Sequence, residues 1–237
     1  MRAEKSTSTP KSEFLLGVRD QLPLLLGVVP FGLIFGALAI SVGIQPLAAQ
    51  GFSLFVFAGS SQLIAVGLIG EMAPALLIVA TILVVNLRHA LYSASMSPHF
   101  VPLHMPWKLS LSWLLTDEAF ATASTHYRRG RTSFAHWYMF GTGLALWTAW
   151  QISTALGILL GGEIPTNFPL TFALPLTFIA LLIPTLVDRP MLAAAASAGV
   201  IAVLLSGLPL KLGLLIGAMA GVGVGVWLDR RSTSVTR

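Results

Sequence analysis

The sequence predicts an all-α, polytopic membrane protein with about eight transmembrane helices and both termini in the cytoplasm. Composition is the first reason: 55% of the 237 residues are hydrophobic and only 10% are charged, whereas a soluble domain carries roughly 25% charged residues. The second reason is a series of apolar runs close to the roughly 20 residues that a helix needs to cross a bilayer. The third is the distribution of the basic residues among the loops.

The domain organisation is simple. Residues 1–20 are predicted as a cytoplasmic tail, in which "SEFLLGVRDQL" has an apolar face and favours a short interfacial helix with Ser12 as its N-cap. A disordered tail fits the residues before Ser12 equally well. Residues 21–228 are predicted as a single transmembrane domain, and residues 229–237 as a second cytoplasmic tail.

Apolar runs between polar, proline and glycine residues define the predicted spans. In chain order they are Leu22–Val42, Leu47–Ile69, Ala73–Ser95, Leu109–Ser124, Phe134–Leu160, Phe168–Val187, Met191–Ser206 and Leu210–Leu228. The fourth is the weakest because it contains Asp117 and Glu118.

The basic residues set the predicted orientation, because Lys and Arg concentrate in cytoplasmic loops. With eight spans and a cytoplasmic N-terminus, residues 127–131 lie inside, and residues 98–107 and 161–167 lie outside. Eleven of the 14 basic residues are then cytoplasmic: Arg2, Lys5, Lys11, Arg19, Arg128, Arg129, Arg131, Arg189, Arg230, Arg231 and Arg237. The positive net charge therefore reflects membrane topology and predicts no nucleic-acid partner.

Charged side chains inside spans are the first candidates for function. Arg88 is the single basic residue placed inside a span, and Asp117 and Glu118 are the single acidic ones. At 1.5 Å per residue, both positions lie roughly 15 Å below the same external surface, so Arg88 is predicted to pair with one of the two carboxylates. The pair could simply join two helices. Because two acids face one base, however, the surplus carboxylate could also bind a proton or a substrate ammonium.

Polar residues occupy two faces of the third predicted span. Asn86, His89 and Ser93 follow i, i+3, i+7 spacing, while Arg88 shares the other face with Tyr92 and Ser95. Two polar faces predict that this helix is central to the bundle. For His89, a structural hydrogen bond is at least as well supported as a role in carrying protons.

A small, polar run interrupts the second predicted span at "FAGSSQ". Gly59, Ser60, Ser61 and Gln62 weaken the helix at mid-membrane depth, where transporters offer backbone groups to a zwitterion. Tight helix packing through small residues is the alternative. In the first span, Pro30 with Gly32 predicts a hinge or kink.

Four glycines of the last predicted span recur at intervals of four residues, and they form a ridge that predicts close helix packing. The ridge is a candidate contact for a partner subunit or for another helix of this chain, and it consists of Gly213, Gly217, Gly221 and Gly225. A weak internal repeat is also suggested between residues 30–96 and residues 141–206, where Pro175 and Pro184 interrupt a span.

Several function classes find no support. Cysteine is absent, which excludes disulfides and thiolate metal sites. No P-loop and no HExxH pattern occurs, and no metal site, catalytic residue or cofactor is predicted. An intramembrane enzyme is the weakest alternative, because His99, His104, His126 and His136 are placed in loops or at boundaries. A channel or a membrane scaffold is a further alternative.

The motifs "PFGLIFGALAISVG", "FAGSSQ", "NLRHALYSAS" and "TDEAFA", followed by the glycine-rich tail, resemble the AzlC family. This family is the large subunit of bacterial branched-chain amino acid exporters linked to azaleucine resistance. The resemblance implies a multi-pass permease of the bacterial inner membrane. It also implies export of leucine, isoleucine, valine and related amino acids, together with a small AzlD-type membrane partner.

A secondary transporter for small apolar zwitterions is therefore the leading hypothesis. Asp117 or Glu118 would bind the ammonium or a coupling proton, and Arg88 or backbone N–H groups would bind the carboxylate. An apolar wall could come from Phe31, Phe55 and Phe57. The predicted substrate-binding set is Gly59, Ser60, Ser61, Gln62, Asn86, Arg88, Asp117 and Glu118, with Asp117, Glu118 and His89 as candidates for proton coupling.

Overall fold

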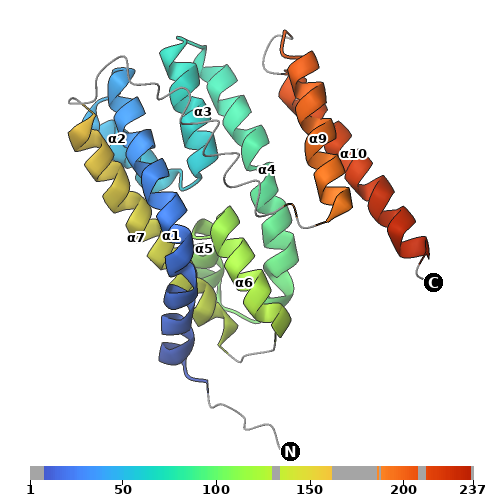
Figure 1. Ribbon diagram of the computed structural model, residues 1–237. Coiled ribbons are helices and arrows are strands. Elements are labelled where there is room, and N and C mark those ends of the chain that lie inside the picture. The colour runs from blue at the N-terminus through green and yellow to red at the C-terminus, as the bar shows by residue number, and fades with distance from the viewer. Residues whose placement is uncertain (1–7, 130–133, 162–185, 187, 208–211, 236–237) are drawn as a thin grey trace, which may run out of the picture. The chain divides into compact units, whose positions relative to one another are not determined.

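The computed structural model describes residues 8–129, 134–161, 186, 188–207 and 212–235 (Figure 1). Every regular element in these ranges is an α-helix. The chain divides into a first unit, Met1–Leu170, and a second unit, Thr171–Arg237. The predicted span Phe168–Val187, with Pro175 and Pro184, lies outside the described residues apart from position 186, as does most of the predicted loop 161–167.

Seven helices of the first unit are described. They are α1 (Pro10–Ser41), α2 (Pro46–Phe55), α3 (Gly59–Gly70), α4 (Ala75–Phe100), α5 (Met105–Trp113), α6 (Asp117–Arg129) and α7 (Ala135–Leu160). Among the described residues, α1, α4 and α7 are the helices long and apolar enough to cross a membrane. The other four have about half that length.

Helix α1 begins before the predicted first span and absorbs the predicted interfacial helix. Its N-cap is Thr9 rather than Ser12. Ser12 occupies the third helical position and closes a capping box, in which the Thr9 side chain accepts from the Ser12 N–H and the Ser12 hydroxyl accepts from the Thr9 N–H. The helix continues through Pro23 and Pro30.

Helices α1 and α7 form the closest pair in the first unit, because glycines let their backbones approach. A Cβ at Gly36 would lie 2.7 Å from the Ile158 nitrogen, and a Cβ at Gly157 would lie 2.9 Å from the Leu33 Cα. A Cβ at Gly32 would collide with the Ser153 hydroxyl. Gly32, predicted as part of a hinge, is therefore a helix-packing residue.

The predicted span Leu47–Ile69 is not one helix. It is broken at Val56–Ala58 into α2 and α3, and α3 returns to the end of the unit where α2 began (Figure 1). A Cβ at Gly70, the last residue of α3, would lie 2.9 Å from Val42, which caps the end of α1. The segment therefore enters and leaves at the same end.

The predicted span Leu109–Ser124 is likewise two helices, α5 and α6, separated by Leu114–Thr116. Near the end of α6, the ring of Tyr127 lies 4.6 Å from His99 at the end of α4, so α6 returns to the end where α5 began. Trp107 at the start of α5 lies 4.9 Å from Trp137 at the start of α7. One continuous helix was predicted here, whereas the structure has two helices that fold back on each other.

The first unit contains a repeat of a long helix followed by two half-length helices: α1–α2–α3, then α4–α5–α6. The second copy is inverted, because α4 ends beside the starts of α5 and α7, whereas α1 begins there. Inverted repeats with broken helices are typical of secondary transporters. The repeat suggested by the sequence, 30–96 with 141–206, has different boundaries and includes residues outside the described ranges.

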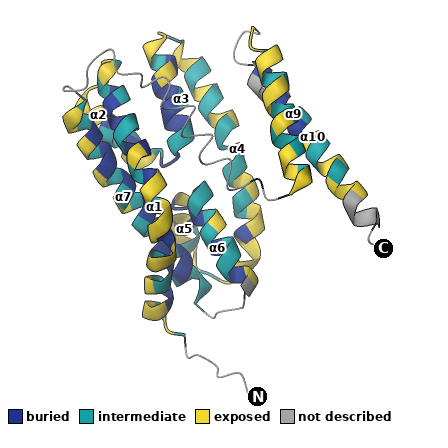
Figure 2. Cartoon of the chain, in the orientation of Figure 1, coloured by how far each residue is buried: buried dark blue, intermediate teal, exposed yellow. Residues whose placement is uncertain are grey.

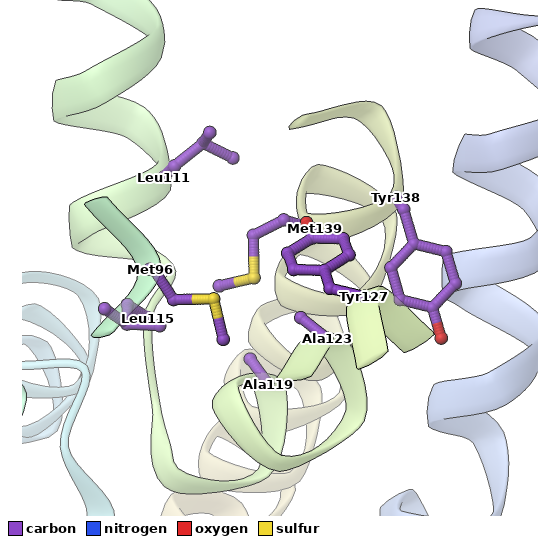
Figure 3. Packing of buried hydrophobic residues seen from close by; sticks show 8 residues of the cluster. All are labelled: Met96, Leu111, Leu115, Ala119, Ala123, Tyr127, Tyr138 and Met139. Carbon is purple, nitrogen blue, oxygen red and sulfur yellow. The ribbon is translucent and has the colours of Figure 1, made fainter. Parts of the chain in front are cut away.

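A hydrophobic core joins α4, α5, α6 and α7. Met96 of α4 and Met139 of α7 point toward each other, and alanines of α6 let the helices approach (Figure 3). The cluster consists of Met96, Leu111, Leu115, Ala119, Ala123, Tyr127, Tyr138 and Met139.

Helix α4 is mostly exposed within the first unit, and its predicted place at the centre of the whole bundle stays a prediction. Met96 is its one buried residue, while Leu76, Leu83, Leu87 and Leu91 are exposed. Figure 2 accordingly shows the helix mostly in teal and yellow. The first turns of α3 and α6 provide the partners of its polar side chains Asn86, Arg88 and Tyr92.

The second unit contains α9 (Arg189–Leu204) and α10 (Leu212–Val235) in its described part. Asp188 caps α9 by accepting a hydrogen bond of 2.7 Å from the Met191 N–H. These helices correspond to the predicted spans Met191–Ser206 and Leu210–Leu228.

Candidate functional site

The first turns of α3 and α6 meet the middle of α4. Arg88 lies thirteen residues after the start of α4 at Ala75 and twelve before its end at Phe100. One guanidinium nitrogen of Arg88 donates to the Ser60 hydroxyl on α3, and the other lies 2.6 Å from Asp117 Oδ2 on α6. A single side chain thus joins the starts of two helices that come from opposite ends of the unit.

The predicted charge pair forms between Arg88 and Asp117. Asp117 also accepts a hydrogen bond of 2.6 Å from the Tyr92 hydroxyl, so both of its oxygens are engaged. The side chains of Arg88 and Asp117 are 30% and 38% exposed, respectively, which leaves room for an incoming ligand. Glu118 forms no ion pair with any described residue and is the surplus carboxylate of the two.

The break before α3 exposes backbone donors. Its N-cap is Ala58, which has no side chain able to cap the helix. N–H groups of an uncapped first turn carry the partial positive charge of the helix and attract anions. At the start of α6, by contrast, the Thr116 hydroxyl accepts from the Ala119 N–H at 3.3 Å.

Three residues at the start of α3 make different contacts. The buried Ser61 hydroxyl lies 3.0 Å from Asn86 Oδ1 on α4. Gln62 is also buried and donates 3.2 Å to the Phe52 carbonyl of α2, which holds the hairpin together. A Cβ at Gly59 would lie 2.8 Å from the Trp150 ring, so the glycine is needed for packing on α7.

Other predicted residues lie around this centre. His89 stands edge-on to Tyr92 at 5.9 Å, and its buried Nε2 has no described hydrogen-bond partner. Phe31 and Phe57 are buried, whereas Phe55 is 79% exposed and cannot form part of an internal apolar wall. Phe57 contacts Trp113 of α5, with ring centroids 6.5 Å apart, and so links the two hairpins.

The glycine ridge packs within the chain. Cβ atoms at Gly217 and Gly221 would lie 2.6 and 2.7 Å from the carbonyl oxygens of Ala198 and Ala194 on α9, and Gly225 also faces Ala194. A Cβ at Gly213 would collide with the Leu205 carbonyl. Of the two contacts predicted for Gly213, Gly217, Gly221 and Gly225, a partner subunit or another helix of this chain, the structure shows the second: the ridge packs on α9.

Sequence reasoning missed two features. Tyr92 was placed on the face of Arg88 but not in the site, although a tyrosine one helical turn from a buried arginine can reach the same carboxylate. His126 was placed in a loop or at a boundary, but it lies within α6, whereas His99 and His136 do lie at helix ends, next to the last residue of α4 and the first residue of α7. The signal for His126 was its spacing from Glu118 and Thr122, four residues apart on one helix face.

Comparisons with known proteins give a consistent picture. The family model described as AzlC protein matches residues 23–164. Inner membrane protein YgaZ of Escherichia coli (strain K12) is 26% identical over 215 residues, which cover 88% of this chain and 81% of that protein. An uncharacterized membrane protein of Archaeoglobus fulgidus is 29% identical over 219 residues, covering 90% of this chain and 94% of that protein.

An uncharacterized membrane protein of Helicobacter pylori is 31% identical over 156 residues, covering 64% of this chain and 67% of that protein. No solved structure matches the chain significantly. The matching relatives are membrane proteins, in agreement with the apolar helices of this chain.

Proposed function

The chain belongs to the AzlC protein family, and from this premise we propose that it is the large subunit of a secondary transporter that exports branched-chain amino acids across the bacterial inner membrane. The observation that carries the proposal is the convergence of two half-helix starts on Arg88 at the middle of α4. Secondary transporters bind substrates and coupling ions at the mid-membrane ends of broken helices.

The site offers complementary groups to a zwitterion. The uncapped first turn of α3 and the guanidinium of Arg88 favour a carboxylate. Glu118, which has no ion pair among the described residues, is the natural partner of an ammonium or of a coupling proton. Phe31 and Phe57 provide buried apolar surface close to the α2–α3 break for a side chain such as that of leucine or valine.

We place α1, α4 and α7 across the membrane, with the two hairpins re-entering from opposite sides. The segments at one end of the unit, 42–45 and 71–74, contain no Lys or Arg. Among the described residues, the opposite end holds Lys11, Arg19, Lys108, Arg128 and Arg129. The positive-inside rule then puts the N-terminus in the cytoplasm. A small AzlD-type membrane subunit is the proposed partner, and co-purification of the two chains tests it.

The proposed activity is tested in proteoliposomes containing the chain together with its partner subunit. We expect saturable counterflow of radiolabelled leucine, which a channel does not give. Glu118→Gln should weaken or abolish leucine counterflow, whereas Glu71→Gln, a matched change at an exposed position after α3, should not. Wild-type vesicles without saturable exchange of leucine, isoleucine or valine would contradict the proposed function.

A further inference from the structure

A second cluster of ionisable groups lies between α1, α6 and α7, away from Arg88. Glu13 of α1 is only 6% exposed, and its Oε2 lies 3.3 Å from Nε2 of His126 on α6. The ring of Tyr138 on α7 stacks on His126, with centroids 3.8 Å apart, and its hydroxyl donates 2.7 Å to Asp20. Three helices are thus joined through one imidazole.

A pocket of about 510 Å³ opens beside this imidazole. His126 and Tyr138 line it, together with Asp20 and Arg19 of α1 and with Thr122 of α6. Glu13 is not part of the lining. The imidazole therefore touches both a pocket that water can enter and a buried carboxylate.

Polar groups lead from this pocket toward the central site. Glu118, Thr122 and His126 are four residues apart and share one face of α6, which spans about 12 Å between the first and the last. On α1, Gln21 follows Glu13 at twice this spacing. It is fully buried, and neither its Nε2 nor its Oε1 has a hydrogen-bond partner in the described part of the chain. Buried polar atoms without a protein partner are usually satisfied by water.

The charge state of the pair depends on one proton. A buried carboxylate is costly beside a neutral imidazole and much less costly beside an imidazolium. Histidine is the side chain whose protonation changes most readily near neutral pH. The other ionisable groups that face the pair are Arg19 and Asp20 from α1, Tyr127 from α6 and Tyr138 from α7.

We propose that Glu13 and His126 form a proton-binding site at the mouth of the transporter, which exchanges protons between the pocket and the central carboxylates along the Glu118–Thr122–His126 face. His126 takes a proton from hydronium in the pocket and leaves water, Glu13 stabilises the resulting imidazolium, and the proton passes to the Glu118 carboxylate through water along the Thr122 face while the imidazole returns to its neutral form. This inference rests on the proposed transport function and assigns its coupling ion.

Two flux measurements distinguish a role in proton coupling from a role in leucine binding. Glu13→Gln and His126→Gln are reconstituted and assayed for leucine counterflow, which needs no net proton movement, and for leucine uptake driven by a pH gradient. We expect both variants to keep wild-type counterflow and to lose gradient-driven uptake. His136→Gln, which changes a partly buried imidazole against Trp107, should keep both fluxes.

The other outcomes are equally decisive. Unchanged gradient-driven uptake in both variants would overturn the proton site and show that the pair has no role in coupling. Loss of both fluxes in both variants would also overturn it and show that the pair is structural. Wild-type counterflow without any gradient-driven uptake would overturn it while leaving the proposed transport function intact.

Wild type without counterflow would contradict the transport function itself. In that case the proton site is tested by a measurement that needs no substrate. The imidazole of His126 in the full chain, identified by comparison with His126→Gln, is followed by nitrogen NMR. At one fixed pH, we expect a larger imidazolium fraction in wild type than in Glu13→Gln, because the Glu13 carboxylate stabilises the charged ring. Equal fractions in the two proteins would overturn the proton site.

Discussion

The two half-helix hairpins, α2–α3 and α5–α6, use the same backbone device with different chemistry. Each enters at one end of the first unit, breaks over three residues and returns to the same end. The second helix of one hairpin begins with glycine and serine, and its N-cap offers no side chain. The second helix of the other begins with Asp117 and Glu118 and is capped by Thr116.

This difference shows how an inverted repeat can produce an asymmetric site. The α2–α3 hairpin presents uncharged donors, and the α5–α6 hairpin presents carboxylates. Helix α4 contacts both hairpins, through Asn86 toward Ser61, Arg88 toward Ser60 and Asp117, and Tyr92 toward Asp117. A zwitterion needs such a pair of unlike surfaces, whereas two identical hairpins would offer it only one kind of group.

The comparison of the α2–α3 and α5–α6 hairpins would not hold if either hairpin crossed the membrane. The chain contains no cysteine, so single cysteines can be introduced at His104, Arg128 and Glu71, all of which are exposed. We expect His104→Cys and Arg128→Cys to react with a membrane-impermeant thiol reagent from the same side, and Glu71→Cys from the other. Eight full crossings would instead put positions 104 and 128 on opposite sides.

Removal of the shared side chain should have the largest energetic effect. Arg88→Ala leaves Asp117 without its cation, and we expect a loss of about 1 to 3 kcal/mol in stability, less than the roughly 3–5 kcal/mol of a fully buried pair, because both side chains are partly exposed. Thermal unfolding of the purified protein measures it. Arg88→Ala with Asp117→Asn should recover part of the loss, and an additive double variant would argue against the pair.

The packing at the start of α3 can be tested by substitutions that change only side-chain volume. Gly59→Ala places a methyl group 2.8 Å from the rigid Trp150 ring, and we expect a destabilisation of about 1 to 2 kcal/mol from overpacking. Gly67→Ala on the same helix meets nothing within 4 Å and should be neutral or slightly stabilising. Equal melting temperatures for the two variants would show that the start of α3 is not tightly packed.

The smallest expected effect concerns one hydrogen bond on the α6 side. Tyr92→Phe removes the donor to Asp117 but leaves the ion pair with Arg88 in place. We expect a cost of about 1 kcal/mol in stability, the typical net contribution of one hydrogen bond, because Asp117 keeps its ion pair. Leucine affinity should also change, because the carboxylate is then held less firmly. Unchanged affinity and stability would show that Arg88 alone positions Asp117.

Several features were predictable from the sequence because they depend on local properties. The hydrophobic runs of α1, α4 and α7 follow from composition and length, and the break near Gly59 follows from residues that form poor helices. The pairing of Arg88 with an acid of "TDEAFA" follows from the cost of an unpaired charge among apolar helices. These conclusions need only the neighbours of each residue in the chain.

Tertiary structure alone decided which runs form one long helix and which form two half-length helices that turn back. Leu47–Ile69 and Leu109–Ser124 are long enough to cross, and hydropathy cannot distinguish a full crossing from two half-length helices that fold against each other. The choice depends on contacts between distant segments, such as Gly70 with Val42 and Tyr127 with His99. The same is true of Glu13 and His126, 113 positions apart in the sequence, because only the packing of α1 on α6 and α7 brings a carboxylate of a predicted tail beside an imidazole of a predicted loop.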